Sequence, residues 1–298
     1  MGTRTPEGGY WSAMSDTWLA VLLALGSALS QAYGAVMRHR TAEGSGPGVG
    51  GTVSALSEPL WWAGTLVSLL GFVLQGAALS YGSLLLVQPV TVLSLLFALP
   101  LGAHVTGRRV TVAEWLWGSL LTVCIGVIVV VGRPVGGEQH PPAWEWFVAT
   151  AAGVAVMALL MWLGRGPFVK DKALLTGVAG GTAFAYVALF TKGVVDRWAA
   201  GGFGELLVTG ELYGLVVAGV TALVVQQASF KAGAVYQAVP ASTVTTPVVS
   251  IALGLALLDE RFTTTPVEFD VLLGALAVMV LATVQLSRTD VAAAAERD

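Results

Sequence analysis

The chain has 298 residues, of which 55% are hydrophobic and only 11% are charged, and its formal net charge is -3. A soluble domain of this length does not combine so few charged residues with a mean hydropathy of +0.77. The slightly acidic balance excludes the basic surface that nucleic-acid-binding proteins need, so no nucleic-acid partner is expected. The composition therefore predicts a protein that crosses a membrane many times.

Nine apolar stretches, each of about 18 to 25 residues, follow one another between short polar loops. A helix needs about 20 apolar residues to cross a hydrocarbon core about 30 Å thick, and its backbone polar groups must be satisfied within the segment. We therefore expect an all-α fold, a polytopic membrane helix bundle in which residues 1–298 form a single integral membrane domain. The spans are predicted at Thr17–Val36, Leu60–Leu79, Leu84–Ala103, Thr111–Val131, Trp144–Leu163, Ala173–Phe190, Leu207–Val225, Ala234–Leu258 and Val267–Leu286.

The loops between these spans set the expected orientation. The glycine-rich Thr41–Pro59 is expected to be a loop, and Ser80–Ser83 is expected to be a very tight turn. Lysine and arginine are more frequent in the loops that share a side with the C-terminus, so the positive-inside rule predicts the N-terminus outside and the C-terminus in the cytoplasm. The mixed charges before the first span do not form a cleavable signal. Alanine, glycine and valine are abundant and arginine outnumbers lysine, as in proteins encoded by GC-rich bacterial genomes. The expected location is therefore a bacterial inner (plasma) membrane.

The two halves of the chain share short sequence patterns at nearly one offset. In both halves, Gln, Ala, Gly and a following Pro recur in the same order and spacing, and an Ala-Tyr-x-Ala pattern precedes them. The matching segments are Gln75–Gly82 with Pro89 and Gln226–Gly233 with Pro240, and earlier Ala32–Ala35 and Ala185–Ala188. We therefore expect an internal repeat, with residues 17–132 as the first copy, 144–163 as a connecting helix and 173–287 as the second copy.

Corresponding spans in the two copies are five crossings apart. Because five is odd, the copies enter the membrane from opposite sides, which makes the repeat an inverted-topology repeat. Such repeats are a common way to build a secondary transporter, because the two copies exchange conformations around a site near the midplane. The alternative is an old duplication in a membrane protein that transports nothing.

The third and eighth spans contain prolines and polar side chains in corresponding places. A proline removes a backbone donor, which is tolerated in a membrane only where protein or water satisfies the freed carbonyl. Paired interrupted helices of this kind indicate a binding site. The alternative is that the hydroxyls bond their own helices and the prolines only bend them. The candidate substrate-pathway residues are Tyr33, Gln75, Gln88, Pro89, Thr91, Tyr186, Gln227, Gln237, Pro240, Thr243 and Thr246, with the two tyrosines closing the cavity.

The remaining chemistry points away from an enzyme. No catalytic motif is present, the single Cys124 cannot form an intramolecular disulfide, and no cofactor or metal site is expected. The acidic residues, Glu260 among them, are expected at span ends or in loops, and none at the centre of a span, where a carboxylate would mark a proton relay or a cation site. Gly177-x-x-x-Gly181 predicts close helix packing. A polar but uncharged centre suits a zwitterionic or amphipathic organic solute better than a tightly held divalent ion.

Blocks in both halves carry a family resemblance. The first half contains Glu58-Pro-Leu-Trp-Trp-Ala-Gly64, Ala78-Leu-Ser-Tyr-Gly82 and Leu86-Val-Gln-Pro89 followed by Leu93-Ser94. The second half contains Lys192-Gly193, the stretch from Gln226 to Pro247 and Asp259-Glu260-Arg261. These blocks resemble the drug/metabolite transporter (EamA-like) superfamily and, within it, the branch of NIPA-type magnesium transporters. The resemblance implies a bundle of about nine helices that moves a small solute across the membrane.

Two departures from the NIPA-like pattern bear on the solute. Members of that branch carry an acidic residue and an asparagine where this chain has Phe72 and Gln75, and an acidic residue near Thr106–Arg109. Both changes remove oxygen ligands for a divalent cation, so the first hypothesis is a permease or exporter of a small organic metabolite or drug. A NIPA-like carrier of magnesium is the second hypothesis, and a non-transporting membrane scaffold is the third. The expected partners are the solute or ion and the lipid bilayer. The sequence leaves open whether the chain forms a homodimer.

Overall fold

A computed structural model describes residues 6–43, 58–107, 109–137, 141–165, 172–231 and 235–295. Within these ranges, eight helices are long and apolar enough to cross a membrane, and Gly210–Gln226 is a shorter apolar helix. The prediction of an all-α polytopic membrane bundle is confirmed. The helices are α1 (Pro6–Glu43), α3 (Pro59–Tyr81), α4 (Leu84–Thr91), α5 (Ser94–Thr106), α6 (Val112–Val130), α7 (Ala143–Gly164), α8 (Lys172–Leu206), α9 (Gly210–Lys231), α10 (Val235–Ala256) and α11 (Pro266–Ala295).

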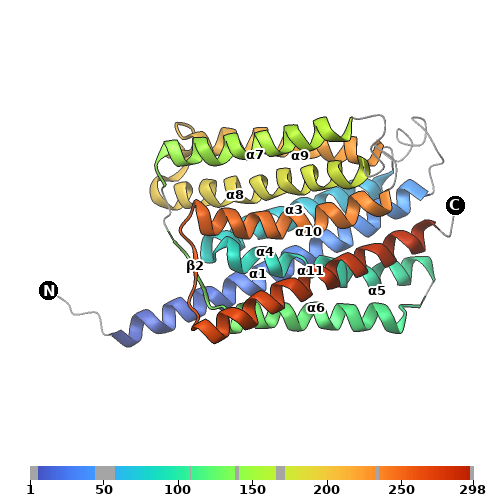
Figure 1. Cartoon of the computed structure of the whole chain (residues 1–298), viewed down its shortest axis with the longest axis horizontal. Coiled ribbons are helices and arrows are strands. Elements are labelled where there is room, and N and C mark those ends of the chain that lie inside the picture. The colour runs from blue at the N-terminus through green and yellow to red at the C-terminus, as the bar shows by residue number, and fades with distance from the viewer. Residues whose placement is uncertain are drawn as a thin grey trace.

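The helices lie side by side along the long axis of the molecule (Figure 1). In this view α7 and α9 form one face, α8 lies beneath them, and α5, α6 and α11 lie on the opposite side. Helix α1 begins at one end of the bundle and α11 finishes at the other end. At the end where α1 begins, β1 (Pro134–Val135) pairs antiparallel with β2 (Arg261–Phe262), which ties the loop after α6 to the loop after α10.

The third predicted span, whose prolines indicated an interrupted helix, consists of two helices. It breaks at Val92–Leu93 into α4 and α5. Pro89 precedes the break and supplies no N–H to the Leu85 carbonyl, so the helical hydrogen-bond ladder is already weakened there. The tight turn between the second and third spans is confirmed, because α3 ends at Tyr81 and the Ser83 hydroxyl caps the first turn of α4.

Small residues allow the closest helix contacts, which fits association in lipid by packing rather than by hydrophobic burial. Gly177 and Gly181 of α8 lie against Ala238 and Ser242 of α10, as their spacing predicted, and a Cβ on Gly181 would come within 2.6 Å of the Ser242 carbonyl oxygen. Helix α1 packs on α3, α4 and α5, and α8 packs on α9, α10 and α7. Helix α6 packs on α11, so the first and second halves also meet at that side.

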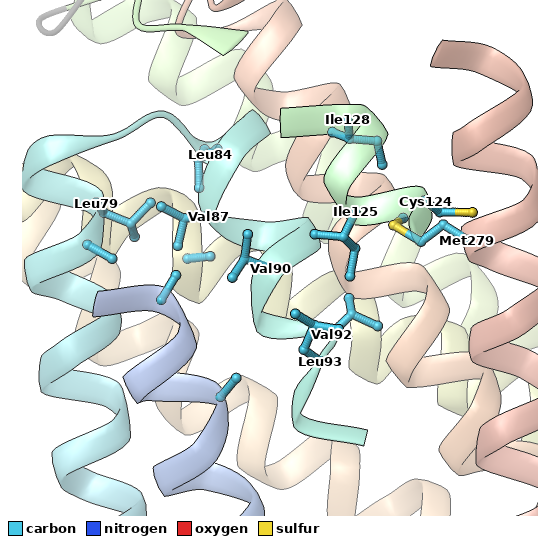
Figure 2. Packing of buried hydrophobic residues seen from close by; sticks show 14 of the residues in the cluster. Leu79, Leu84, Val87, Val90, Val92, Leu93, Cys124, Ile125, Ile128 and Met279 are labelled. Atoms are coloured by element: carbon cyan, nitrogen blue, oxygen red, sulfur yellow. The ribbon is translucent and has the colours of Figure 1, made fainter. Parts of the chain in front are cut away.

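The centre of the bundle is a cluster of buried aliphatic side chains around α4 (Figure 2). Leu84, Val87 and Val90 of α4 are fully or almost fully buried. Figure 2 shows Ile125 of α6 and Met279 of α11 reaching the same cluster from the other side. The short helix α4 is therefore held inside the bundle, where its backbone polar groups need partners from protein.

Candidate functional site

The buried α4 lies against the proline-containing α10, and we call this contact the α4–α10 seam. Leu85 of α4 lies at Gly254 of α10, where a Cβ would come within 2.6 Å of the Leu85 Cδ1 atom. The two helices run in opposite directions (Figure 1). One turn deeper into the bundle, this register brings Gln88 of α4 level with Ser250 of α10. The structure thus brings together residues from the two spans that the sequence singled out.

The seam contains two polar groups whose hydrogen-bonding capacity is unused. The side chain of Gln88 is 1% exposed and Ser250 is 0% exposed. Within the described residues, the Nε2 atom of Gln88 and the Oγ atom of Ser250 are buried without a hydrogen-bond partner. Leaving such a group unsatisfied costs about 1–3 kcal/mol, so native proteins retain it where a water, ion or ligand binds.

The polar residues next to the seam bond mainly to backbone. The Thr91 hydroxyl donates to the Gln88 carbonyl at 2.8 Å, and Thr243 donates to Val239 at 2.8 Å. Thr246 donates to Ser242 at 2.9 Å within its own helix and to Gly181 of α8 at 3.2 Å. Each of these hydroxyls donates its hydrogen to a backbone carbonyl, but its oxygen can still accept a hydrogen bond from a solute. Pro89 and Pro240 are both buried in their helices.

Three other candidate residues lie away from the seam. Gln75 of α3 accepts from the Gln31 amide of α1 at 3.4 Å, so it belongs to the α1–α3 contact. Tyr33 is 45% exposed on α1. Tyr186 is 6% exposed and its hydroxyl donates to the Ala149 carbonyl of α7. The side chains of Gln227 and Gln237 lie outside the described residues, so their place in a pathway stays a prediction.

A buried cluster of charges, which the sequence reading did not single out, closes one end of the seam. The ammonium of Lys192 on α8 donates to Asp196 at 2.9 Å and to the Leu79 carbonyl of α3 at 2.9 Å. The Lys192 and Asp196 side chains are 12% and 5% exposed. Glu260, in the connection after α10, is 1% exposed and accepts from the N–H groups of Leu84 at 2.9 Å and Leu85 at 3.1 Å.

Glu260 is the most perturbed acid of this cluster. Burial raises the pKa of the Glu260 carboxyl, because the charged form loses its hydration. The N–H groups of Leu84 and Leu85 and the ammonium of Lys192 act in the opposite direction, and Asp196 raises the pKa further. The balance favours proton uptake on this carboxyl, which lies in a connection between spans, as the sequence predicted, but is buried there.

Two sequence signals could have revealed this cluster. Lys192 and Asp196 are four residues apart, which places them on one face of a helix where opposite charges pair. Glu260 belongs to one of the blocks that carry the family resemblance. Its contact with α4 joins residues far apart in the chain, and such a contact leaves no local pattern. Among the described residues, no group of three or more His, Cys, Asp or Glu is placed to hold a metal ion.

The chain is similar over nearly its whole length to an uncharacterized protein of Corynebacterium glutamicum. The two are 42% identical over 281 residues, which cover 93% of this chain and 97% of that protein. The chain belongs to the same family as that protein. No family model matches the chain. No solved structure matches it either.

More distant relatives come from Arabidopsis thaliana. The protein named "Probable magnesium transporter NIPA4" is 29% identical over 165 residues, which cover 54% of this chain and 47% of that protein. The protein named "Probable magnesium transporter NIPA3" is 30% identical over 146 residues, which cover 47% of this chain and 39% of that protein. The chain therefore spans less than half the length of these plant relatives in the matched region. The homology to NIPA proteins that the sequence blocks indicated is confirmed as a distant one.

Proposed function

We propose that this protein is a secondary transporter that binds a small solute in the α4–α10 seam and exposes it alternately to the two sides of the membrane. Residues 17–132 and 173–287 are the two inverted copies, and residues 144–163, within α7, connect them. The protein belongs in the bacterial plasma membrane with its N-terminus outside and its C-terminus in the cytoplasm. We place it in the drug/metabolite transporter superfamily.

The packing of the helices supports the two-copy arrangement. In the first copy, α3 and the α4–α5 pair both pack on α1; in the second copy, α9 and α10 both pack on α8. Small buried residues follow the same spacing on the two leading helices. They are Ala20, Ala24 and Ala28 on α1, and Ala173, Gly177 and Gly181 on α8, at the same offset that relates Tyr33 to Tyr186. This agreement favours a common ancestor for the two copies.

The single observation that carries the transport proposal is the interrupted helix in the seam. A helix broken at membrane depth is stable only where protein or a wet cavity satisfies its backbone. Here the break lies next to buried, unpaired Gln88 and Ser250, and α10 contributes two further prolines, Pro240 and Pro247. Transporters hold their substrates at discontinuous helices of this kind.

The chemistry of the seam favours an organic solute without strong net charge. Gln88 offers amide donors and an acceptor, and Ser250, Thr91 and Thr243 offer hydroxyl oxygens among aliphatic side chains. Such a lining binds hydroxyl, amide or zwitterionic groups together with an apolar body. We therefore propose a small organic metabolite or drug as the solute.

A second candidate function is transport of magnesium, which the plant relatives' names favour. Mg²⁺ prefers oxygen ligands and keeps several waters, so backbone carbonyls freed at the break would suffice for a weak, hydrated site. The deciding measurement is Mg²⁺ entry into proteoliposomes with an entrapped fluorescent indicator, compared with protein-free vesicles. Saturable uptake would establish magnesium as a solute. Absence of uptake by folded protein would leave the organic solute, to be identified by a thermal-shift screen of metabolites.

The seam itself is tested by removing its unpaired groups. We expect Gln88→Leu with Ser250→Ala to leave the thermal stability unchanged or raise it, because buried polar groups without partners are replaced by apolar ones. The same variant should reduce solute flux by about tenfold or more, since each lost hydrogen bond to the solute weakens binding. Transport at the wild-type rate in this stable variant would refute the site.

The threonines of α10 give a second, milder test. Thr243→Val with Thr246→Val should lower flux without unfolding the protein. Each removed hydroxyl donates to backbone carbonyls in helices, and those carbonyls still accept an N–H group of their own helix. Thr122→Val on α6 is a matched control, since its hydroxyl likewise donates to a carbonyl one turn earlier, that of Gly118 at 2.9 Å. Equal loss of flux in the control would show that the effect comes from helix packing and not from the seam.

A further inference from the structure

One carboxyl joins the two helices of the seam at its outer end. Glu260 follows α10 and accepts from the first two N–H groups of α4, those of Leu84 and Leu85. Its own N–H donates to the Gly254 carbonyl at 3.0 Å, which folds the connection back on α10. A Cβ on Gly254 would come within 2.6 Å of Glu260 Oε2, so the carboxyl fits only because this position is glycine. Moving α4 away from α10 therefore breaks the Glu260 contacts.

Two charged side chains of α8 act on Glu260. Among the described residues, Lys192 lowers the pKa of the Glu260 carboxyl and Asp196 raises it, and all three groups are largely buried. Asp259 and Arg261, on either side of Glu260, pair with each other at an exposed position. Asp16 of α1 is exposed, and α4 and β1 have no titratable side chain. A proton on Glu260 removes the repulsion between its carboxylate and that of Asp196.

We propose that Glu260 is a proton-binding site that controls this end of the seam: the closed contact between α4 and α10 holds a proton on Glu260, and opening releases that proton to water. The inference deepens the proposed transport function by naming the ion that acts on its gate. The proton comes from the aqueous phase at the end of the bundle where Glu260 lies and binds a carboxylate oxygen. No other reactant is needed.

Linkage fixes the sign of the pH effect. Burial and Asp196 raise the pKa of Glu260 in the closed contact above the value of a hydrated carboxyl, so the closed contact binds the proton more tightly than the open one. The stabilisation of the closed contact is complete below the ordinary pKa of glutamate. It is lost as the pH rises through the raised pKa of the closed form. Low pH therefore closes the seam and high pH favours its opening.

The polar groups deeper in the seam agree with a gate at this place. Gln88 and Ser250 lie one turn inward from the level of Leu85 and Gly254, where Glu260 is bound. When the contact opens, water reaches these unpaired groups first. The side chain that senses the proton and the groups that we propose to bind the solute are thus neighbours along one seam.

Amide hydrogen exchange of the intact protein in lipid nanodiscs tests the proposal without any solute. After correction for the intrinsic pH dependence of exchange, the protection of residues 80–90 in the wild type should fall as the pH rises from about 5 to about 8, by at most about tenfold per pH unit because one proton is involved. Glu260→Gln, a permanently neutral side chain of the same size, should stay protected at every pH.

A matched carboxyl serves as the control. Glu268 lies near the same end and accepts from the Thr265 N–H at 2.7 Å, but its side chain is 30% exposed beside Arg133. Glu268→Gln should keep the wild-type pH profile. Protection of the wild-type segment that does not change with pH would overturn the proposal. So would a Glu260→Gln protein that keeps the pH dependence or loses protection at every pH, because the proton would then not be what holds the contact. Since exchange needs no transport, a failed flux assay leaves this result intact.

Discussion

The two helices that begin the two halves, α1 and α8, have related sequences but different surroundings. Tyr186 of α8 is 6% exposed because α7 covers it, whereas the matching Tyr33 of α1 is 45% exposed. Leu22 and Leu29 of α1 are also exposed, at 64% and 50%. The difference arises because α7 packs on α8 and covers Tyr186, which agrees with the proposal that α7 connects two copies and has no counterpart of its own.

The two copies also differ in buried charge. The second copy buries Lys192 and Asp196, and Glu260 caps α4 across the seam. At the corresponding connection of the first copy the sequence reads Thr106-Gly-Arg-Arg109, with no carboxylate. In the inverted pair that we propose, different chemistry at the two ends would close those ends with different strengths. Such asymmetry suits a transporter whose two gates respond to different signals.

Removing the buried ammonium of Lys192 should change the free energy of unfolding more than any other substitution that tests this comparison. Lys192→Met removes the ammonium that pairs with Asp196 at 2.9 Å, and breaking a buried ion pair from one side costs about 3–5 kcal/mol. The free energy of unfolding in mixed micelles measures the loss. Arg133→Met is the control, because its pair with Glu268 is solvent-exposed and should contribute nothing measurable. Equal costs for the two changes would show that the buried cluster has no special role.

A smaller effect is expected from closing the space between α8 and α10. Gly181→Ala places a Cβ within 2.6 Å of the Ser242 carbonyl oxygen and 2.7 Å of Thr245 Cβ, and such overpacking costs about 1–3 kcal/mol. The same change at Gly219 of α9, which has open space around its Cβ position, should stabilise by about 0.5–1 kcal/mol through helix propensity. Thermal unfolding of both variants gives the signs. Destabilisation at Gly219 as well would trace the cost at Gly181 to something other than packing.

The fold was largely predictable because each membrane crossing leaves its own local pattern. Within the described residues, eight of the nine predicted spans correspond to helices long and apolar enough to cross a membrane, and the seventh corresponds to the shorter apolar helix Gly210–Gln226. Several helices, such as α1 and α11, extend beyond the predicted apolar spans. The prolines predicted an interruption in the third span but not its position at Val92–Leu93, because a proline weakens the hydrogen-bond ladder without deciding where the neighbouring helices allow the helix to end. The hydropathy pattern also placed the end of the sixth span at Phe190, although α8 continues to Leu206. Polar residues after Phe190 pair with one another within this helix, as Lys192 and Asp196 do.

The candidate site was predictable only in part, for a physical reason. Prolines and threonines identified the third and eighth spans from sequence spacing alone, and the structure packs these spans against each other. The burial of Glu260 depends on the N–H groups of Leu84 and Leu85, which belong to the other half of the chain. No local pattern records such a contact. The membrane orientation, the inverted repeat and the pathway residues stay predictions that the experiments above address.

The smallest effect tests the comparison between α1 and α8 most directly. Tyr186→Phe removes a hydroxyl that donates to the Ala149 carbonyl of α7, so the variant should lose about 0.5–1.5 kcal/mol of stability. Tyr33→Phe should leave stability unchanged, because its side chain is 45% exposed and its hydroxyl has no hydrogen-bond partner among the described residues. Thermal unfolding of the two variants in the same detergent measures the difference. If both tyrosines contribute equally, the exposed face of α1 has a partner that takes the place of α7, and cross-linking of a cysteine at position 33 would then show a second copy of the chain on that face.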